Sequence, residues 1–165
     1  MKSITARKLA FEEFRIYGAF TAMINPRAPK IGEEPVEFFR DMVQLDLGNS
    51  GTASFSTCRV LKRDPVISAL EYHSYAGEGI LPLDGDILLT VAPATATDKP
   101  QVAKIEVFYV PQGTFVAIRP GVWHCAPFAA KADCVNVAII LPERAYANDC
   151  CVAELPEKMA VVSPQ

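Results

Sequence analysis

The chain has 165 residues, of which 50% are hydrophobic, and its net charge is −3. This length favours one domain over residues 1–165 with a sizeable core, and the composition argues against disorder. No basic cluster is present, which argues against a nucleic-acid partner, and no apolar run reaches the roughly 20 residues that a membrane helix needs.

The first residues predict an extended segment over 2–9 and then a short helix over 11–17. This helix directs Phe11 and Phe14 inward, with Ile16 as a further inward candidate, and ends at Gly18. The segments 26–35 and 93–101 are rich in proline or polar residues and are typical of loops. Further strands, predicted from β-branched and aromatic residues between Gly, Pro and Asp, cover 19–24, 41–47, 53–61, 66–72, 79–82, 86–92, 105–110, 114–118 and 134–141.

Many short strands, few helices and 13 prolines indicate an all-β barrel or sandwich. The segment 87–92 is almost wholly apolar. We therefore expect one of its faces to meet the barrel interior and the other to meet a second sheet or subunit.

The five cysteines bear on the cellular compartment. Their number is odd, and Cys150 and Cys151 are adjacent, which disfavours a disulfide between them. The first residues also lack the apolar core of a signal peptide. We expect five free thiols in a reducing cytoplasm.

The chain has two histidines, His73 and His124, each at the edge of a turn beside an apolar run. Glu71 and His73 are two residues apart, so on a strand they face the same side. Glu78 follows five residues after His73, between two glycines. Two imidazoles with nearby carboxylates can build a metal site or an acid–base site.

These spacings resemble the two sequence motifs of the cupins. The positions in register are His73, Glu78 and Gly85 in the first motif and Gly113, Gly121 and His124 in the second. Glu71 and Arg119 stand where the pattern has His and Pro. The resemblance implies a double-stranded β-helix, or jelly-roll barrel, with the short N-terminal helix in front of it.

A narrower resemblance, to the ureidoglycolate lyase family, covers about residues 66–128. It lies in Leu70-Glu-Tyr-His73, Ile80-Leu-Pro-Leu-Asp-Gly85 and Gly121-Val-Trp-His124. It implies an enzyme of allantoin (purine) catabolism that cleaves ureidoglycolate into glyoxylate and urea with a divalent metal ion, nickel or another. The candidate ligands and catalytic residues are His73, Glu78 and His124, with Glu71 as a further ligand.

Two more residues are candidates for substrate binding. An arginine near a barrel mouth suits a substrate carboxylate, which favours Arg144, and Trp123 beside His124 is a candidate pocket wall. Each candidate also has a structural interpretation. The histidines and Trp123 fit core positions, Glu78 fits a turn, Glu71 and Arg144 fit the surface, and Cys125 fits a small buried residue.

The chain departs from the family in its supposed pocket: Glu78 replaces the usual Gln and Cys125 replaces a second His. These changes motivate a second hypothesis, a cupin isomerase or lyase for another small hydroxy acid or sugar. A third is a cupin that binds a metabolite without catalysis. Clustered titrating groups favour an enzyme, and the apolar strands favour a homodimer.

Overall fold

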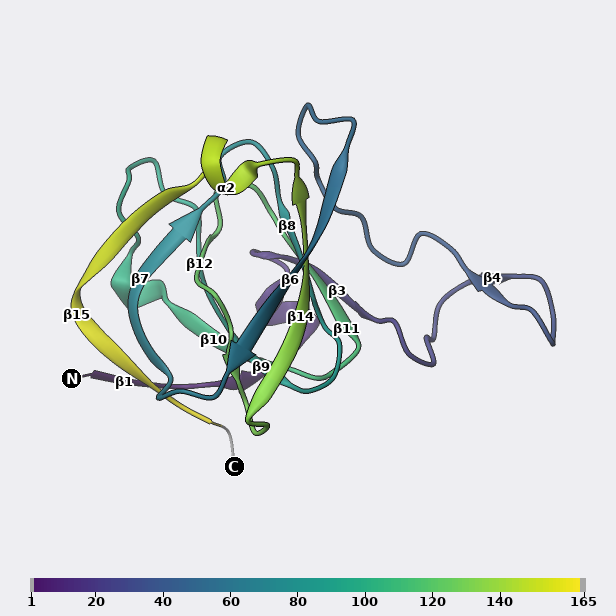
Figure 1. The fold of residues 1–165 in the computed structure, drawn as a ribbon, viewed down its shortest axis with the longest axis horizontal. Helices are drawn as coiled ribbons and strands as arrows, with labels where there is room; N and C mark the ends of the chain where they lie inside the picture. The colour runs from purple at the N-terminus through teal and green to yellow at the C-terminus, as the bar shows by residue number, and fades with distance from the viewer. Residues whose placement is uncertain (1, 164–165) are drawn as a thin grey trace.

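The computed structural model describes residues 2–163, and its strands form two large sheets that face each other (Figure 1). One sheet has the order β1-β15-β7-β12-β9-β10-β2, with β13 paired to β9, and the other has the order β3-β11-β8-β14-β6. The strands of the first sheet are β1 (Lys2–Thr5), β2 (Arg7–Lys8), β7 (Val66–Tyr72), β9 (Ile87–Ala92), β10 (Glu106–Val110), β12 (Trp123–His124), β13 (Phe128–Ala129) and β15 (Cys151–Val162). Those of the second are β3 (Gly18–Ala22), β6 (Ala53–Leu61), β8 (Glu78–Pro82), β11 (Thr114–Ile118) and β14 (Cys134–Pro142).

The first sheet curls until its two edges almost meet. β1 pairs in parallel with β15 at one edge, and β2 pairs in parallel with β10 at the other. Only the buried Ala6 separates β1 from β2 in the chain. A single N-terminal segment thus bridges both edges and nearly closes the barrel, which leaves few unpaired backbone groups.

Two apolar cores result from this curl. The first lies between the two sheets and contains side chains of both, such as Leu89, Val116 and Val135. The second lies inside the curled sheet and contains Leu88, Trp123 and Met159. β9 is buried along its whole length because its alternate side chains enter the two cores. This confirms that 87–92 is covered on both faces. One face packs against the second sheet, and the other packs against distant strands of its own curled sheet.

A long excursion between β3 and β6 leaves the barrel. It contains the two-stranded pairing of β4 (Lys30–Ile31) with β5 (Phe38–Phe39), which extends away from the main body in Figure 1. Ile31, Val36 and Phe38 are exposed on this arm.

The all-β class and most strand bounds are confirmed, and 53–61, 66–72 and 114–118 agree at both ends. The strand predicted over 41–47 is wrong, because that segment has no ladder partner. β15 was not predicted, since Glu154, Pro156 and the charged residues after it interrupt its apolar pattern.

The helices are shorter than the sequence indicates. α1 (Phe11–Phe14) is one turn that buries Phe14, whereas Phe11 and Ile16, predicted to face inward, are exposed. Tyr17 is buried in their place. A second turn, α2 (Ala145–Asn148), and the 3-10 turn η1 (Val102–Lys104) complete the helical content of residues 2–163. No helix among these residues has the length and apolar content to span a membrane.

Candidate metal centre

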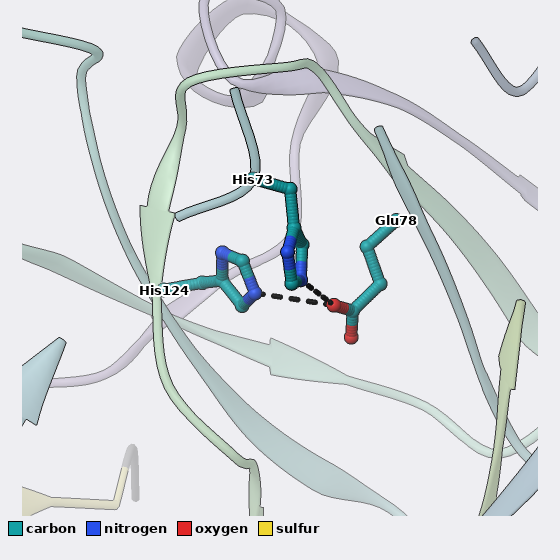
Figure 2. Close-up of side chains that lie close together, drawn as sticks. All are labelled: His73, Glu78 and His124. Carbon is teal, nitrogen blue, oxygen red and sulfur yellow. Dashed lines mark hydrogen bonds and ion pairs between the residues drawn. The ribbon is translucent and has the colours of Figure 1, made fainter. Parts of the chain in front are cut away.

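Three side chains meet at the end of the barrel near α2: His73 and the nearby Glu78, and His124 from a distant part of the sequence (Figure 2). Nε2 of His73 lies 3.0 Å from Oε2 of Glu78, and Nε2 of His124 lies 3.2 Å from the same oxygen. One ligand atom from each residue falls within a 4.8 Å cluster. All three residues are buried.

The sheet register explains how His124 reaches this cluster. His124 lies opposite Glu71 of β7 and Val91 of β9, and directly paired residues point to the same side of a sheet. Val91 belongs to the core between the sheets, so His124 faces that space as well. The preceding residue, Trp123, points to the opposite side and enters the second core.

Close backbone packing explains the glycines on either side of Glu78. A Cβ on Gly77 would lie 2.3 Å from the Ile118 carbonyl oxygen, and one on Gly79 would lie 2.8 Å from Cζ of Phe115. Neither glycine has a positive φ. These residues are therefore small because neighbours approach, and their contacts fix the start of β8, which carries Glu78.

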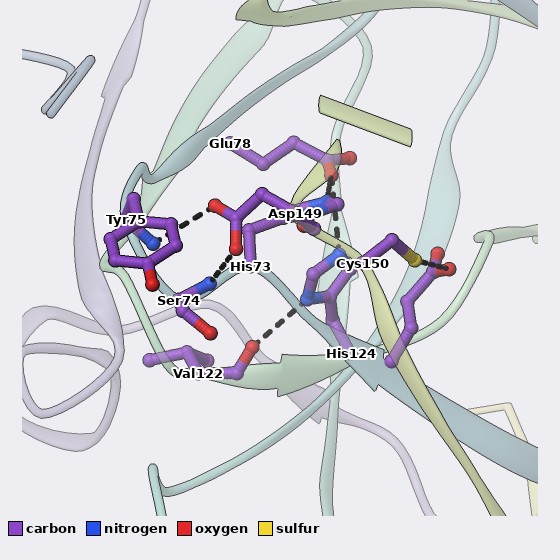
Figure 3. Close-up of polar contacts among 9 residues, drawn as sticks. His73, Ser74, Tyr75, Glu78, Val122, His124, Asp149 and Cys150 are labelled. Carbon is purple, nitrogen blue, oxygen red and sulfur yellow. Dashed lines mark hydrogen bonds and ion pairs between the residues drawn. The ribbon is translucent and has the colours of Figure 1, made fainter. Parts of the chain in front are cut away.

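The second ring nitrogen of each histidine determines where its proton sits (Figure 3). Nδ1 of His124 lies 2.9 Å from the Val122 carbonyl oxygen, and Nδ1 of His73 contacts the Asp149 carbonyl oxygen. A carbonyl oxygen only accepts hydrogen bonds, so each Nδ1 must donate. In the neutral rings, each Nε2 then carries a lone pair directed at the Glu78 carboxylate.

This donor set fits a metal ion. Two Nε2 lone pairs and a carboxylate oxygen converge in a buried place, and all three are acceptors that repel one another unless a positive charge lies between them. Two imidazoles and a carboxylate, with each Nδ1–H tied to a carbonyl, are common zinc and transition-metal ligands.

Without a metal ion, protons on the histidines can supply the positive charge that offsets the repulsion among these acceptors. Burial alone would raise the pKa of Glu78, but the charges and hydrogen bonds of His124 and His73 outweigh it and lower the pKa to about 2. Burial alone would lower the pKa of each histidine, but the contacts with Glu78 outweigh it and raise both pKa values. The arrangement of these three residues therefore favours a positive charge beside the Glu78 carboxylate, and either protons on the histidines or a metal ion would supply it.

The other sequence candidates lie outside this cluster. Oε2 of Glu71 accepts a hydrogen bond from Sγ of Cys150 at 3.3 Å, on the His124 side of the strand pair. The Arg144 side chain is 70% exposed, and its Nε lies 3.7 Å from Glu143. Trp123 is buried in the second core, where Nε1 donates to Thr95 Oγ1 at 2.9 Å.

All five cysteines are free, as the sequence indicates. Burial raises the pKa of the Cys125 thiol to about 11, so this residue is a neutral thiol at neutral pH. Cys125 is half-buried, and it packs against the second core as a small residue, which is close to its structural interpretation from the sequence.

Asp149 was not among the site residues predicted from the sequence, although Asn148-Asp149-Cys150 resembles a segment of the ureidoglycolate lyase family. It follows α2 and contacts His73 through its backbone carbonyl. Its carboxylate accepts the backbone N–H groups of Ser74 and Tyr75 (Figure 3). Asp149 and His73 are 76 positions apart, so no spacing pattern links them.

Comparison with known proteins gives a family match along nearly the whole chain. A family model described as ureidoglycolate lyase matches residues 1–162. A protein of Agrobacterium fabrum named "Putative ureidoglycolate lyase" is 27% identical over 132 residues, which cover 75% of this chain and 74% of the relative.

Solved structures show more distant similarity. A dTDP sugar isomerase from Desulfovibrio desulfuricans aligns with a TM-score of 0.48 and 16% identity, over 84% of this chain and 83% of its own. A sugar 3,4-ketoisomerase from Thermoanaerobacterium thermosaccharolyticum, in complex with TDP, aligns with a TM-score of 0.44 and 12% identity, over 80% of this chain and 85% of its own.

Proposed function

The chain belongs to the ureidoglycolate lyase family, and from that membership we propose that it is a carbon–nitrogen lyase that cleaves ureidoglycolate into glyoxylate and urea with a bound divalent metal ion. The observation that carries the metal-assisted part is the convergence of two Nε2 atoms on the buried Glu78 carboxylate. The metal's identity is left open between nickel and other divalent ions.

The proposed reaction needs no covalent bond between the protein and the substrate. The substrate carbon bears a hydroxyl, a carboxylate and a ureido group. The hydroxyl proton leaves, the carbon–oxygen double bond forms as the carbon–nitrogen bond breaks, and the departing nitrogen takes up a proton to give urea. The protein must orient the substrate, accept one proton and return one.

In the proposal, His73, Glu78 and His124 would hold the metal, and the metal would supply Lewis-acid chemistry that makes a hydroxyl group more acidic. Glu71 stands outside the cluster but on the His124 side of its strand, and is not engaged by either histidine. We assign to it the proton transfer, as a carboxylate that need not be a ligand.

Arg144 is proposed to bind the substrate carboxylate. It is an exposed arginine whose partner in the structure is the neighbouring Glu143, a weak exposed pair that a substrate carboxylate can replace. The Trp123 ring packs on the far side of β12 from His124, so it supports the strand that carries His124 and does not line a pocket beside that residue.

The direct test is turnover. The purified protein, loaded in turn with Ni²⁺, Mn²⁺, Zn²⁺ or Co²⁺, should release glyoxylate and urea in equal amounts from ureidoglycolate. His73→Ala should abolish this release, whereas Asp84→Ala, in the turn that follows the other end of β8, should not. Absence of turnover with every ion, or normal turnover in His73→Ala, would defeat the proposal.

A second candidate is a cupin isomerase or lyase for another small hydroxy acid or sugar. It is favoured by the charged Glu78 where the family usually has a neutral Gln, since the added charge changes what the centre can bind. Offering sugars and sugar acids to the same metal-loaded preparations separates the two, because only one substrate class should turn over.

We also propose a homodimer. β6 is an edge strand of nine residues on which Phe55 is 79% exposed, and the β4–β5 arm exposes Phe38 to 63%. A second copy that covers these surfaces would remove an edge open to aggregation. Light scattering should give twice the monomer mass, and Phe55→Ser with Phe38→Ser should reduce it; a monomer mass for the wild type contradicts the proposal.

Five free thiols agree with a reducing compartment, and we propose the cytoplasm. Fractionation of the source cells, followed by detection of the chain with an antibody, tests this. Recovery outside the cytoplasmic fraction contradicts it.

A further inference from the structure

Asp149 contacts three consecutive residues of the β7–β8 loop (Figure 3). Its Oδ1 accepts the backbone N–H of Ser74 at 2.6 Å, and its Oδ2 accepts that of Tyr75 at 2.9 Å. Its own backbone carbonyl accepts the Nδ1–H of His73. One residue thus holds both the loop backbone and the histidine ring.

The rest of the loop is fixed by other segments. The Gly121 N–H donates to the His73 carbonyl at 2.7 Å, and the Gly77 N–H donates to the Asp46 carbonyl at 2.8 Å. Between these two anchors, Ser74 and Tyr75 depend on Asp149 for acceptors of their backbone N–H groups. Two charge-assisted hydrogen bonds from one carboxylate are stronger than the neutral equivalents.

The tautomer of His73 follows from this clamp. A neutral imidazole beside a carboxylate would prefer to place its proton on Nε2 and donate it to Glu78. The Asp149 carbonyl competes for that proton at Nδ1 and leaves the Nε2 lone pair free. A ring with Nε2–H cannot bind a metal through Nε2.

We propose that Asp149 is the positioning residue of the metal centre: its carboxylate fixes the loop at Ser74 and Tyr75 and thereby holds its carbonyl on His73, which sets the ring in the metal-binding tautomer. The consequence for metal binding rests on the proposed function, whereas the consequence for the tautomer does not. His124 is the internal reference, because its acceptor, Val122, lies two residues earlier in the chain.

The first measurement is metal affinity by titration calorimetry. Asp149→Ala should weaken binding about 10–100-fold, the usual effect of losing a contact that orients a ligand. Asp149→Asn, which keeps one acceptor oxygen, should fall between Asp149→Ala and the wild type. The matched control is Asp84→Ala, because the Asp84 carboxylate accepts the Asn136 N–H at 2.7 Å in the turn that follows β8. This control should bind metal as the wild type does.

The second measurement needs no metal. Nitrogen-15 spectra of the histidine rings, recorded at a pH that leaves both rings neutral, report which nitrogen carries the proton. Both rings of the wild type should show Nδ1–H, and in Asp149→Ala only His73 should shift towards Nε2–H. If Asp149→Ala does not fold, metal affinity and the nitrogen-15 spectra are measured on Asp149→Asn instead.

Three outcomes would overturn the inference: Nε2–H at His73 in the wild type, an unchanged tautomer in the Asp149 variants, or equal loss of affinity in Asp84→Ala and Asp149→Ala. If the wild type binds no metal but the tautomer of His73 still shifts in the variants, the metal part of the proposed function fails and the positioning role of Asp149 stands.

Discussion

The two histidines face one carboxylate but are supported in different ways. His124 lies between β7 and β9 and donates its Nδ1–H to a residue two positions earlier in the chain. His73 lies just past the end of β7 and depends on Asp149, 76 positions later. The His124 half of the centre is therefore built within the sheet, whereas the His73 half also needs a contact with the segment between α2 and β15.

The largest expected effect tests whether the different support of His73 and His124 changes how much each histidine contributes to metal affinity. His73→Ala and His124→Ala should each remove a ligand and lower metal affinity by more than the roughly 10–100-fold that loss of an orienting contact causes. Metal content after dialysis and titration calorimetry measure this. A much smaller loss in one variant would show that its histidine is not a ligand.

The shared acceptor comes next. Glu78→Gln keeps the size of the side chain but removes the charge that both Nε2 atoms face. We expect metal affinity to fall about tenfold, equivalent to roughly 1.4 kcal/mol, with the fold retained, as judged by circular dichroism. Unchanged affinity would mean that the two rings bind metal without the charge of this carboxylate.

The His73 side can also be disturbed through the backbone of its loop. Gly77→Ala places a Cβ against the Ile118 carbonyl, a backbone atom that cannot rotate away, and should cost about 1–3 kcal/mol in the free energy of unfolding. Gly51→Ala is the control, because nothing lies within 4 Å of its added Cβ. Urea denaturation compares the two, and equal costs would show that the contact at Gly77 is easily relieved.

The remaining prediction concerns pH, which acts on both histidines together. In the metal-free protein, the raised pKa values of His73 and His124 stabilise the fold below their ordinary value of 6.5, and this stabilisation is lost as pH rises through the folded-state values. The lowered pKa of Glu78 stabilises above its ordinary 4.5 and is lost as pH falls towards about 2.

Metal competes with these protons, since a ligating imidazole must be neutral. The stabilisation that metal adds should therefore grow as pH rises from about 5 to 8, by at most about 1.4 kcal/mol per pH unit for each proton displaced. Scanning calorimetry with and without metal measures the difference. A metal effect that is flat across this range would contradict displacement of histidine protons.

Local sequence patterns were enough to predict most strands of the structure. The alternation and composition of segments such as 53–61 and 66–72 depend on short stretches of sequence, and these strands agree with the structure at both ends. The same alternation places adjacent strand residues on opposite faces, so the burial of Trp123 away from His124 was available from the pattern.

Features that depend on distant partners were not accessible in this way. No local signal in the sequence indicates the contact between Asp149 and His73. None indicates β15 either, because its middle is polar and its pairing with β7 shifts register after Glu154. The depth at which Glu78 is buried depends on Ile118 and Phe115, which pack on its flanking glycines from β11.

The position of Trp123 gives the protein a built-in optical reporter. It is the single tryptophan of the chain, it is buried, and its backbone is bonded directly to that of His124. Its fluorescence therefore comes from one defined place, on the reverse face of the strand that carries a candidate ligand. Quenching by a paramagnetic ion such as Ni²⁺ or Cu²⁺, and its absence with Zn²⁺, should follow occupancy of the centre without any label.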